Sequence, residues 1–203
     1  MPLTSNFPSR LLVLDTATPM LSVALFDGSH LLAADHRLVG RGHAEHLLPA
    51  IAALPDGGRC DSIWVGCGPG SFTGIRIAIA AARALAFAWN ASLTGFDTLA
   101  LIAAGSGSSS VTVAIDGGHG EWFIGGDGSA ARSLTPERAA VEVLSNDVAG
   151  LRAEVLVADR GWGRAIAADA DARHALAMPP TAFVTPARPI YGRQPDAKVA
   201  GAA

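Results

Sequence analysis

The stretch Gly68-Pro69-Gly70-Ser71-Phe72-Thr73-Gly74-Ile75-Arg76 follows a strand-like run, residues 62–67, and opens a long apolar segment that ends near Asn90. So many glycines in one loop are costly, because glycine loses more backbone freedom on folding than any other residue. We therefore expect the loop to turn sharply, or to lie very close to a ligand or to another chain. The order of strand, glycine loop and helix also directs backbone N–H groups toward one spot.

The loop does not match the familiar phosphate-binding or catalytic motifs. A P-loop ends in Gly-Lys-Ser/Thr, whereas the only lysine of this chain is far away, near its C-terminal end. A nucleophile elbow requires glycines on both sides of Ser71, where Pro69 and Thr73 stand. A dinucleotide fingerprint is one residue shorter than the spacing of residues 68–74, although Asp97 follows at a suitable distance. A dinucleotide site and a loop that only packs a helix onto a sheet both remain open.

Composition favours a cytoplasmic protein that does not bind nucleic acid on its own. Half of the 203 residues are hydrophobic and the net charge is −3, without the basic excess of a nucleic-acid-binding domain. The most apolar run, residues 75–89, is interrupted by Arg76 and Arg83 and is shorter than a membrane span. No signal peptide is evident at the start. Cys60 and Cys67 form no metal or redox motif, which indicates reduced thiols.

The alternation of apolar runs and turns predicts the same order of elements twice. In residues 1–104, three strands (11–15, 21–26 and 30–36), a helix (42–54), a strand (62–67) and a helix (73–90) are followed by a short strand and a helix that begins near Asp97. Residues 105–110, rich in serine and glycine, read as a flexible connection. In residues 111–203, we expect strands at 111–116 and 121–125, a helix at 135–144, a strand at 155–158, a helix at 162–171 and an irregular tail.

Duplicated βββαβα units predict an α/β fold of the actin/hexokinase/Hsp70 (ASKHA) class, with two lobes built on RNase H-like mixed sheets. In that class, nucleotide phosphates lie between the lobes and contact the first hairpin of each. Asp15 and Asp116, each at the end of an apolar strand, are then candidates for a phosphate- or metal-facing pair, with Thr16 and Gly117 beside them. The alternative is that each aspartate merely ends its strand before a turn.

Several segments resemble the TsaB family. They are Leu14-Asp15-Thr16-Ala17, Ser22-Val23-Ala24-Leu25, His43-Ala44-Glu45-His46-Leu47-Leu48-Pro49, the glycine loop, and the tail from Pro189 to Lys198. The resemblance implies a non-catalytic paralogue of the threonylcarbamoyltransferase TsaD, in the machinery that makes N6-threonylcarbamoyladenosine in tRNA. It also implies dimerisation with TsaD, a larger complex with the ATPase TsaE, and contact with tRNA only through that complex. A homodimer of the isolated chain is a further expectation.

The sequence itself favours loss of chemistry. TsaD-type relatives bind a metal with His-x-x-x-His, whereas His43 and His46 are three residues apart, and two ligands do not make a site. We therefore expect no catalytic residues, no metal and no tightly bound cofactor. Many relatives have Asp-Ala-Arg where this chain has Asp116-Gly117-Gly118, which leaves weak nucleotide binding open. The alternative function is a nucleotide-dependent kinase or acyltransferase that uses Asp15 and Asp116.

The long helix is the segment expected to bind a partner. It is apolar nearly all round, which predicts burial nearly all round, and its alanines would let another helix approach closely. A charge at Ala82 or Ala86 is expected to abolish pairing while the monomer stays folded. The candidate interface residues come from this helix, the loop before it and the preceding helix: His43, His46, Leu47, Gly70, Ser71, Phe72, Thr73, Gly74, Ile75, Arg76, Ile79, Ala82, Arg83 and Ala86.

Overall fold

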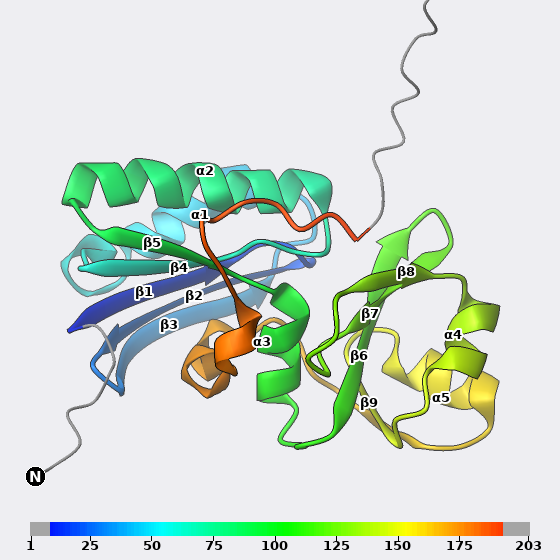
Figure 1. Ribbon diagram of the computed structural model, residues 1–203. Helices are drawn as coiled ribbons and strands as arrows, with labels where there is room; N and C mark the ends of the chain where they lie inside the picture. The colour runs from blue at the N-terminus through cyan, green and yellow to red at the C-terminus, as the bar shows by residue number, and fades with distance from the viewer. Residues whose placement is uncertain (1–8, 193–203) are drawn as a thin grey trace, which may run out of the picture.

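The computed structural model describes residues 9–192, which form two lobes, each built around a mixed β-sheet (Figure 1). In each sheet, three consecutive strands are antiparallel, and the next strand pairs in parallel with the first of them. The two sheets therefore share one strand order, β3-β2-β1-β4-β5 in the first lobe and β8-β7-β6-β9-β10 in the second. This shared order confirms the predicted ASKHA-type duplication.

The first lobe follows the predicted order closely. Its helix α2 (Phe72–Trp89) is preceded by Ser71, whose hydroxyl accepts a hydrogen bond from the Gly74 N–H, and is followed by Asn90, whose φ is 55°. A 3-10 helix at Pro55–Gly58 follows α1. The remaining elements of the lobe are β1 (Arg10–Asp15), β2 (Met20–Asp27), β3 (His30–Leu38), α1 (His43–Ala52), β4 (Ser62–Gly66), α2 (Phe72–Trp89), β5 (Ser92–Phe96) and α3 (Thr98–Gly105).

Strand β1 is buried on both faces, and its alternating side chains join two different cores. Leu12 and Leu14 pack into the core beneath α1 and α2. Leu11 and Val13 pack into the core between the lobes, together with side chains of α3 and of the second sheet. The continuous apolar run of β1 is therefore explained by burial on both sides, as in other sheets that are covered on both faces.

The second lobe has the expected architecture, but two of its predicted elements are wrong. Residues 155–158 are helical rather than extended, because Ala153 and Leu156 are buried at helical spacing while Val155 is exposed. Residues 162–171 contain a strand instead of a helix. The elements of the lobe are β6 (Val111–Gly118), β7 (Glu121–Gly125), β8 (Arg132–Leu134), α4 (Pro136–Glu142), β9 (Asp147–Ala149), α5 (Ala153–Arg160) and β10 (Arg164–Ile166).

The chain then returns to the first lobe, so the predicted second lobe at 111–203 is too long. A 3-10 helix at Ala172–Ala177 packs into the core between the lobes, and a second 3-10 helix covers Pro180–Ala182. The short strand β11 (Phe183–Val184) extends the first sheet by pairing with β5. Residues 185–192, red in Figure 1, then pass alongside α2. Residues 193–198 of the tail motif lie outside the described residues.

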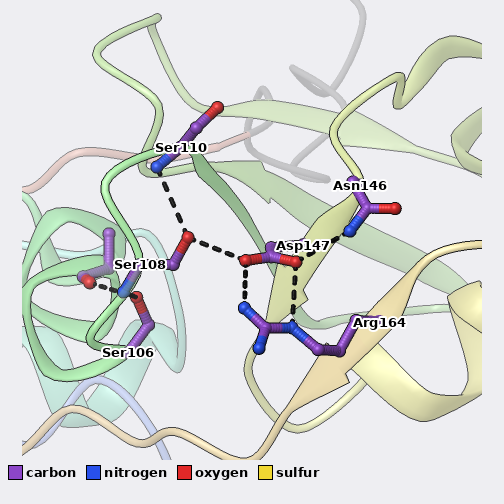
Figure 2. Close-up of polar contacts among 7 residues, drawn as sticks. Ser106, Ser108, Ser110, Asn146, Asp147 and Arg164 are labelled. Carbon is purple, nitrogen blue, oxygen red and sulfur yellow. Dashed lines mark hydrogen bonds and ion pairs between the residues drawn. The ribbon is translucent and has the colours of Figure 1, made fainter.

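The serine-rich connection between α3 and β6 is held by hydrogen bonds, not left as a flexible linker. Figure 2 shows the Ser108 hydroxyl donating to Asp147 over 2.8 Å, while the Ser110 N–H donates to the Ser108 hydroxyl. Arg164 donates to both carboxylate oxygens of Asp147 from the neighbouring strand β10. The connection is thus attached to the first residue of β9, an inner strand of the second sheet.

Candidate functional site

The glycine loop packs against the loop between β1 and β2. A Cβ atom on Gly74 would lie 1.9 Å from the carbonyl oxygen of Thr16, and one on Gly70 would lie 2.2 Å from that of Ala17. The Thr16 hydroxyl donates to the Gly74 carbonyl over 2.8 Å. The close approach that the glycines were expected to serve is therefore made to the chain itself, and the loop packs the first turn of α2 onto the sheet.

Asp15 is buried beneath this contact. Its side chain is fully buried and accepts hydrogen bonds of 2.7 Å from the Ala17 N–H and from the Thr98 hydroxyl. A Cβ atom on Gly66 would lie 1.9 Å from its carboxylate, so a side chain at position 66 would clash with Asp15. Burial raises its pKa to about 6. Asp15 does not line the cavity described next, which corrects the expectation that it faces a phosphate or metal.

Asp116 has the opposite environment. Its carboxylate is half exposed and pairs with Arg152, with 2.5 Å between Oδ2 and Nη2. A hydrogen bond from the Gly118 N–H, together with Arg152, holds its pKa below the usual range of an aspartate. Asp116 and Gly117 line the cavity between the lobes, whereas Thr16 is buried. The structure therefore separates the four residues predicted as one nucleotide site into two environments.

A cavity of about 800 Å³ lies between the two lobes. The first lobe contributes residues 17–19 and 70–72, and the second contributes residues 115–119, Phe123 and Leu151–Arg152. Tyr191 and Gly192 of the returning segment close one side. This is the position in which the fold class places ligands, between the first hairpins of the two lobes.

The histidines of α1 do not form a metal site. His43 is buried and its Nε2 lies 3.2 Å from the Met20 carbonyl oxygen, whereas His46 is exposed. Among residues 9–192, no group of three histidine, cysteine or carboxylate side chains is placed to hold a metal ion. Cys60 and Cys67 are free thiols, and burial raises the pKa of each to about 11.

Helix α2 is buried on one face only, which corrects the expectation of burial nearly all round. By length and composition alone it is apolar enough to cross a membrane, a test that core helices of soluble proteins also pass. Here its inner face covers the first sheet beside α1 (Figure 1). The predicted interface residues that this chain buries itself are His43, Leu47, Gly74, Ile75, Ile79, Ala82 and Ala86.

The remaining predicted interface residues are accessible. Gly70 is partly buried, and the others are exposed: His46, Ser71, Phe72, Thr73, Arg76 and Arg83. The prediction that Ala82 and Ala86 face a partner is therefore wrong, since their exposed fractions are 0% and 9%. A glutamate at either position would enter the protein's own core.

Further exposed side chains continue this face: its alanines were expected to allow a close helix contact, whereas Phe87 was not predicted. Ala80, Ala84 and Ala88 form one line along α2, and the side chain of Phe87 is 92% exposed. The spacing of three and four residues between these positions places them on one face of the helix. The sequence alone could not show whether that face points to solvent or to the sheet.

The returning segment and the start of α2 are joined by aromatic and arginine contacts. The Phe72 and Tyr191 rings stack with centroids 5.3 Å apart, and the Arg76 guanidinium lies 3.6 Å from the centre of the Phe72 ring. Arg83 donates to the Ala187 carbonyl over 2.9 Å. Tyr191 was part of the quoted tail motif, but nothing in the sequence indicated that it meets Phe72.

The duplicated sheets and the cleft between them define a two-lobed protein of the ASKHA class. The ethanolamine utilization protein EutJ of Carboxydothermus hydrogenoformans has the same fold, with a TM-score of 0.51 at 12% identity over 89% of this chain and 91% of that one. At that identity the likeness concerns the fold alone.

Closer comparisons define the family. The family model for the tRNA N6-adenosine threonylcarbamoyltransferase TsaD matches residues 37–151. YeaZ of Pseudomonas aeruginosa superposes with a TM-score of 0.73 at 29% identity, over 90% of this chain and 99% of that one. A further P. aeruginosa structure, of an uncharacterized protein similar to peptidase YeaZ, gives 0.72 at 30% identity, over 91% and 100%. This chain belongs to the TsaB (YeaZ-type) family.

Curated relatives from Escherichia coli and Haemophilus influenzae carry the same functional name. The tRNA threonylcarbamoyladenosine biosynthesis protein TsaB of Escherichia coli K12 is 38% identical over 124 residues, which are 56% of this chain and 53% of that protein. The match thus spans about half the length of the curated relative.

Proposed function

We propose that this chain is a non-catalytic cytoplasmic subunit that binds and activates a TsaD-type threonylcarbamoyltransferase. The complex would modify the adenosine next to the anticodon of tRNAs that read codons beginning with A. The family of the chain and the name of its E. coli relative support the pathway.

The exposed face of α2 is the observation that carries this proposal. Arg76, Ala80, Arg83, Ala84 and Phe87 follow one another at spacings of one, three and four residues and all face solvent. Such a stripe matches the contact face of a paired helix. The alanines would allow a partner helix to approach closely. The exposed Phe87 ring is a large apolar group, and burying it against a partner would be favourable.

A TsaD-type paralogue is the partner that fits this face best. The TsaD family model matches residues 37–151, a range that includes α1 and α2, so a TsaD-type protein would possess an equivalent helix pair. We expect α1 and α2 to pack against those equivalents. Association with the ATPase TsaE would then involve the assembled pair, and tRNA would be contacted mainly by the partner.

The kinase or acyltransferase alternative finds little support. It required Asp15 and Asp116 to face one bound nucleotide, and Asp15 is fully buried behind Gly66. That alternative also gives no role to the exposed face of α2.

Size-exclusion chromatography with light scattering tests the proposal, with the chain alone and mixed with the TsaD homologue of its own organism. We expect a stoichiometric heterodimer. Ala84→Glu should remove it, because burying an unpaired charge costs several kcal/mol. Ala158→Glu, on the exposed face of α5, is the matched control and should pair normally. If the unmodified chain forms no complex, with or without nucleotide and TsaE, the proposed function is wrong.

A further inference from the structure

Two stretches of the chain lack carboxylate side chains. Neither aspartate nor glutamate occurs at residues 62–96 or at residues 172–192, although the whole chain has 18 acidic residues. The first stretch contains α2, and the second contains the returning segment, residues 185–192, which passes alongside α2 (Figure 1). One side of the first lobe therefore combines two segments that carry basic side chains without acidic ones.

Three exposed arginines belong to these two segments, and we call them the arginine edge: Arg76, Arg83 and Arg188. Among the residues that the structure describes, none of the three forms an ion pair with a carboxylate. Helix α1, which packs beside α2, adds one carboxylate, Glu45 in its first turn. The combined face thus keeps an excess of positive charge in a chain whose net charge is −3.

Uncharged groups hold two of these arginines in place. The Arg76 guanidinium lies 3.6 Å from the centre of the Phe72 ring and 3.5 Å from the Tyr191 hydroxyl. Arg83 donates to the Ala187 carbonyl over 2.9 Å. These contacts leave the positive charges unneutralised, and a guanidinium has further N–H donors for another acceptor. Both guanidinium groups are therefore positioned to bind carboxylates from outside the chain.

The apolar part of the face does not select between partners. Ala80, Ala84 and Phe87 lie beside the arginines on α2 and are exposed. They would favour contact with a second copy of this chain as well as with a paralogue. A TsaD-type paralogue would have helices of similar shape, because the TsaD family model matches the range that contains α1 and α2. Charge, rather than shape, is then the property that distinguishes the two partners.

We propose that the arginine edge selects a partner whose contacting surface carries carboxylates, and that it opposes the pairing of two copies of this chain. This inference rests on the proposed docking through the exposed face of α2. In a symmetric homodimer the same surface of each copy forms the interface, so the arginines of both copies would gather there. Like charges across an interface cost affinity, whereas carboxylates that face the arginine edge increase it. The TsaD-type partner therefore presents acidic side chains to this edge.

Opposite salt dependences of the two dimers test the inference. We expect the heterodimer with the TsaD homologue to weaken roughly tenfold between about 50 mM and about 500 mM NaCl, because salt screens the attraction between exposed charges. Any homodimer of the chain alone should tighten over the same range, because salt then screens repulsion. Isothermal titration calorimetry measures the heterodimer, and sedimentation equilibrium measures the homodimer.

Arg83→Gln separates the charge of the arginine edge from its packing. The glutamine amide can still donate to the Ala187 carbonyl, but the positive charge is gone. We expect a heterodimer weakened about threefold or more and less sensitive to salt, and a tighter homodimer. Arg83→Lys keeps the charge and should retain the salt dependence. Arg138→Gln is the matched control, since Arg138 is 63% exposed on α4 of the second lobe and its charge should affect neither dimer.

Three results would overturn the inference and leave the docking function standing. They are a heterodimer whose affinity changes neither with salt nor in Arg83→Gln, a homodimer that salt weakens, and a loss in Arg83→Gln that occurs equally in Arg83→Lys. Absence of any heterodimer would instead overturn the docking function, and with it this inference. Circular dichroism of each variant establishes that it is folded.

Discussion

A Cβ atom on Gly74 would lie 1.9 Å from the Thr16 carbonyl oxygen, while the Thr16 hydroxyl donates to the Gly74 carbonyl over 2.8 Å. The first turn of α2 and the loop after β1 therefore lie so close together that any side chain at position 74 would clash with the backbone. The glycine motif that marks this family serves, in this fold, the placement of α2 on the sheet.

Gly74→Ala tests that contact. The added methyl group must push backbone apart, and we expect a loss of at least ~2 kcal/mol in the free energy of unfolding measured with urea. Gly28→Ala is the control, because Gly28 has no atom within 4 Å of a Cβ and only its φ of +55° is strained, a cost of about 1 kcal/mol. Equal losses of stability in the two variants would mean that the backbone around Gly74 relaxes to accommodate the methyl group.

The glycines of the loop predicted a close approach of its backbone to a ligand or to another chain, but they could not identify the group it approaches. Thr16 and Gly74 are 58 residues apart, and no local pattern links them. A ligand and the protein's own backbone make the same demand on a glycine, so only the fold distinguishes them. Most of the first lobe was predictable because its apolar runs are separated by clear turn residues and glycines.

The second lobe was harder for a physical reason. Residues 155–157 form a short apolar run that fits a strand or a buried helix equally well, and the helix fully buries Ala153 and Leu156 while Val155 stays exposed. Strand β11 is two residues long and pairs with β5 across 87 positions of sequence, as in Phe183 with Phe96. Such pairing carries no local signal, so the return of the chain to the first lobe was missed.

Burial of Asp15 predicts a pH dependence of stability. Its pKa is raised by burial to about 6, above the value near 3.9 of an unfolded chain. The folded state therefore retains a proton that the unfolded state has lost. The contribution of Asp15 to the free energy of unfolding is therefore complete below about pH 4, falls by roughly 3 kcal/mol as the pH rises to about 6, and changes no further above that.

Asp15→Asn removes most of that slope, because an amide does not ionise. Urea unfolding at several pH values between 4 and 7 measures it. Asp97, whose pKa burial also raises, leaves a residual slope of the same sign. Asp27→Asn, at the exposed end of β2, is the control and should keep the slope of the unmodified chain. A steep slope that survives in Asp15→Asn would assign the effect to another group.

The exposed face of α2 predicts self-association of the isolated chain. Phe87 is 92% exposed, so Phe87→Ser should change the free energy of unfolding by no more than about 0.5 kcal/mol. It should nevertheless weaken any homodimer, which light scattering over a concentration series detects. Leu144→Ser is the control, since Leu144 is 79% exposed on the second lobe. A dimer weakened by Leu144→Ser instead would place the contact on the second lobe.

The Asp147 cluster in Figure 2 predicts how the connection between the lobes is kept in place. Hydrogen bonds from Arg164 and Ser108 lower the pKa of Asp147 to about 2. The carboxylate is therefore charged at neutral pH, and its stabilising effect is complete above about pH 4 and is lost as the pH falls through 2. Asp147→Asn removes the charge that Arg164 and Ser108 bind, without a change in volume.

Hydrogen exchange of the amides at 106–110 measures the consequence. We expect faster exchange in Asp147→Asn at neutral pH, since the Ser110 N–H is held through Ser108, whose hydroxyl is in turn held by Asp147. Amides of β1, which lies in the other sheet, should be unaffected. Asp159→Asn, an exposed carboxylate on α5, is the matched control. Unchanged exchange at 106–110 in Asp147→Asn would mean that packing of α3 and β6, rather than this carboxylate, orders the connection.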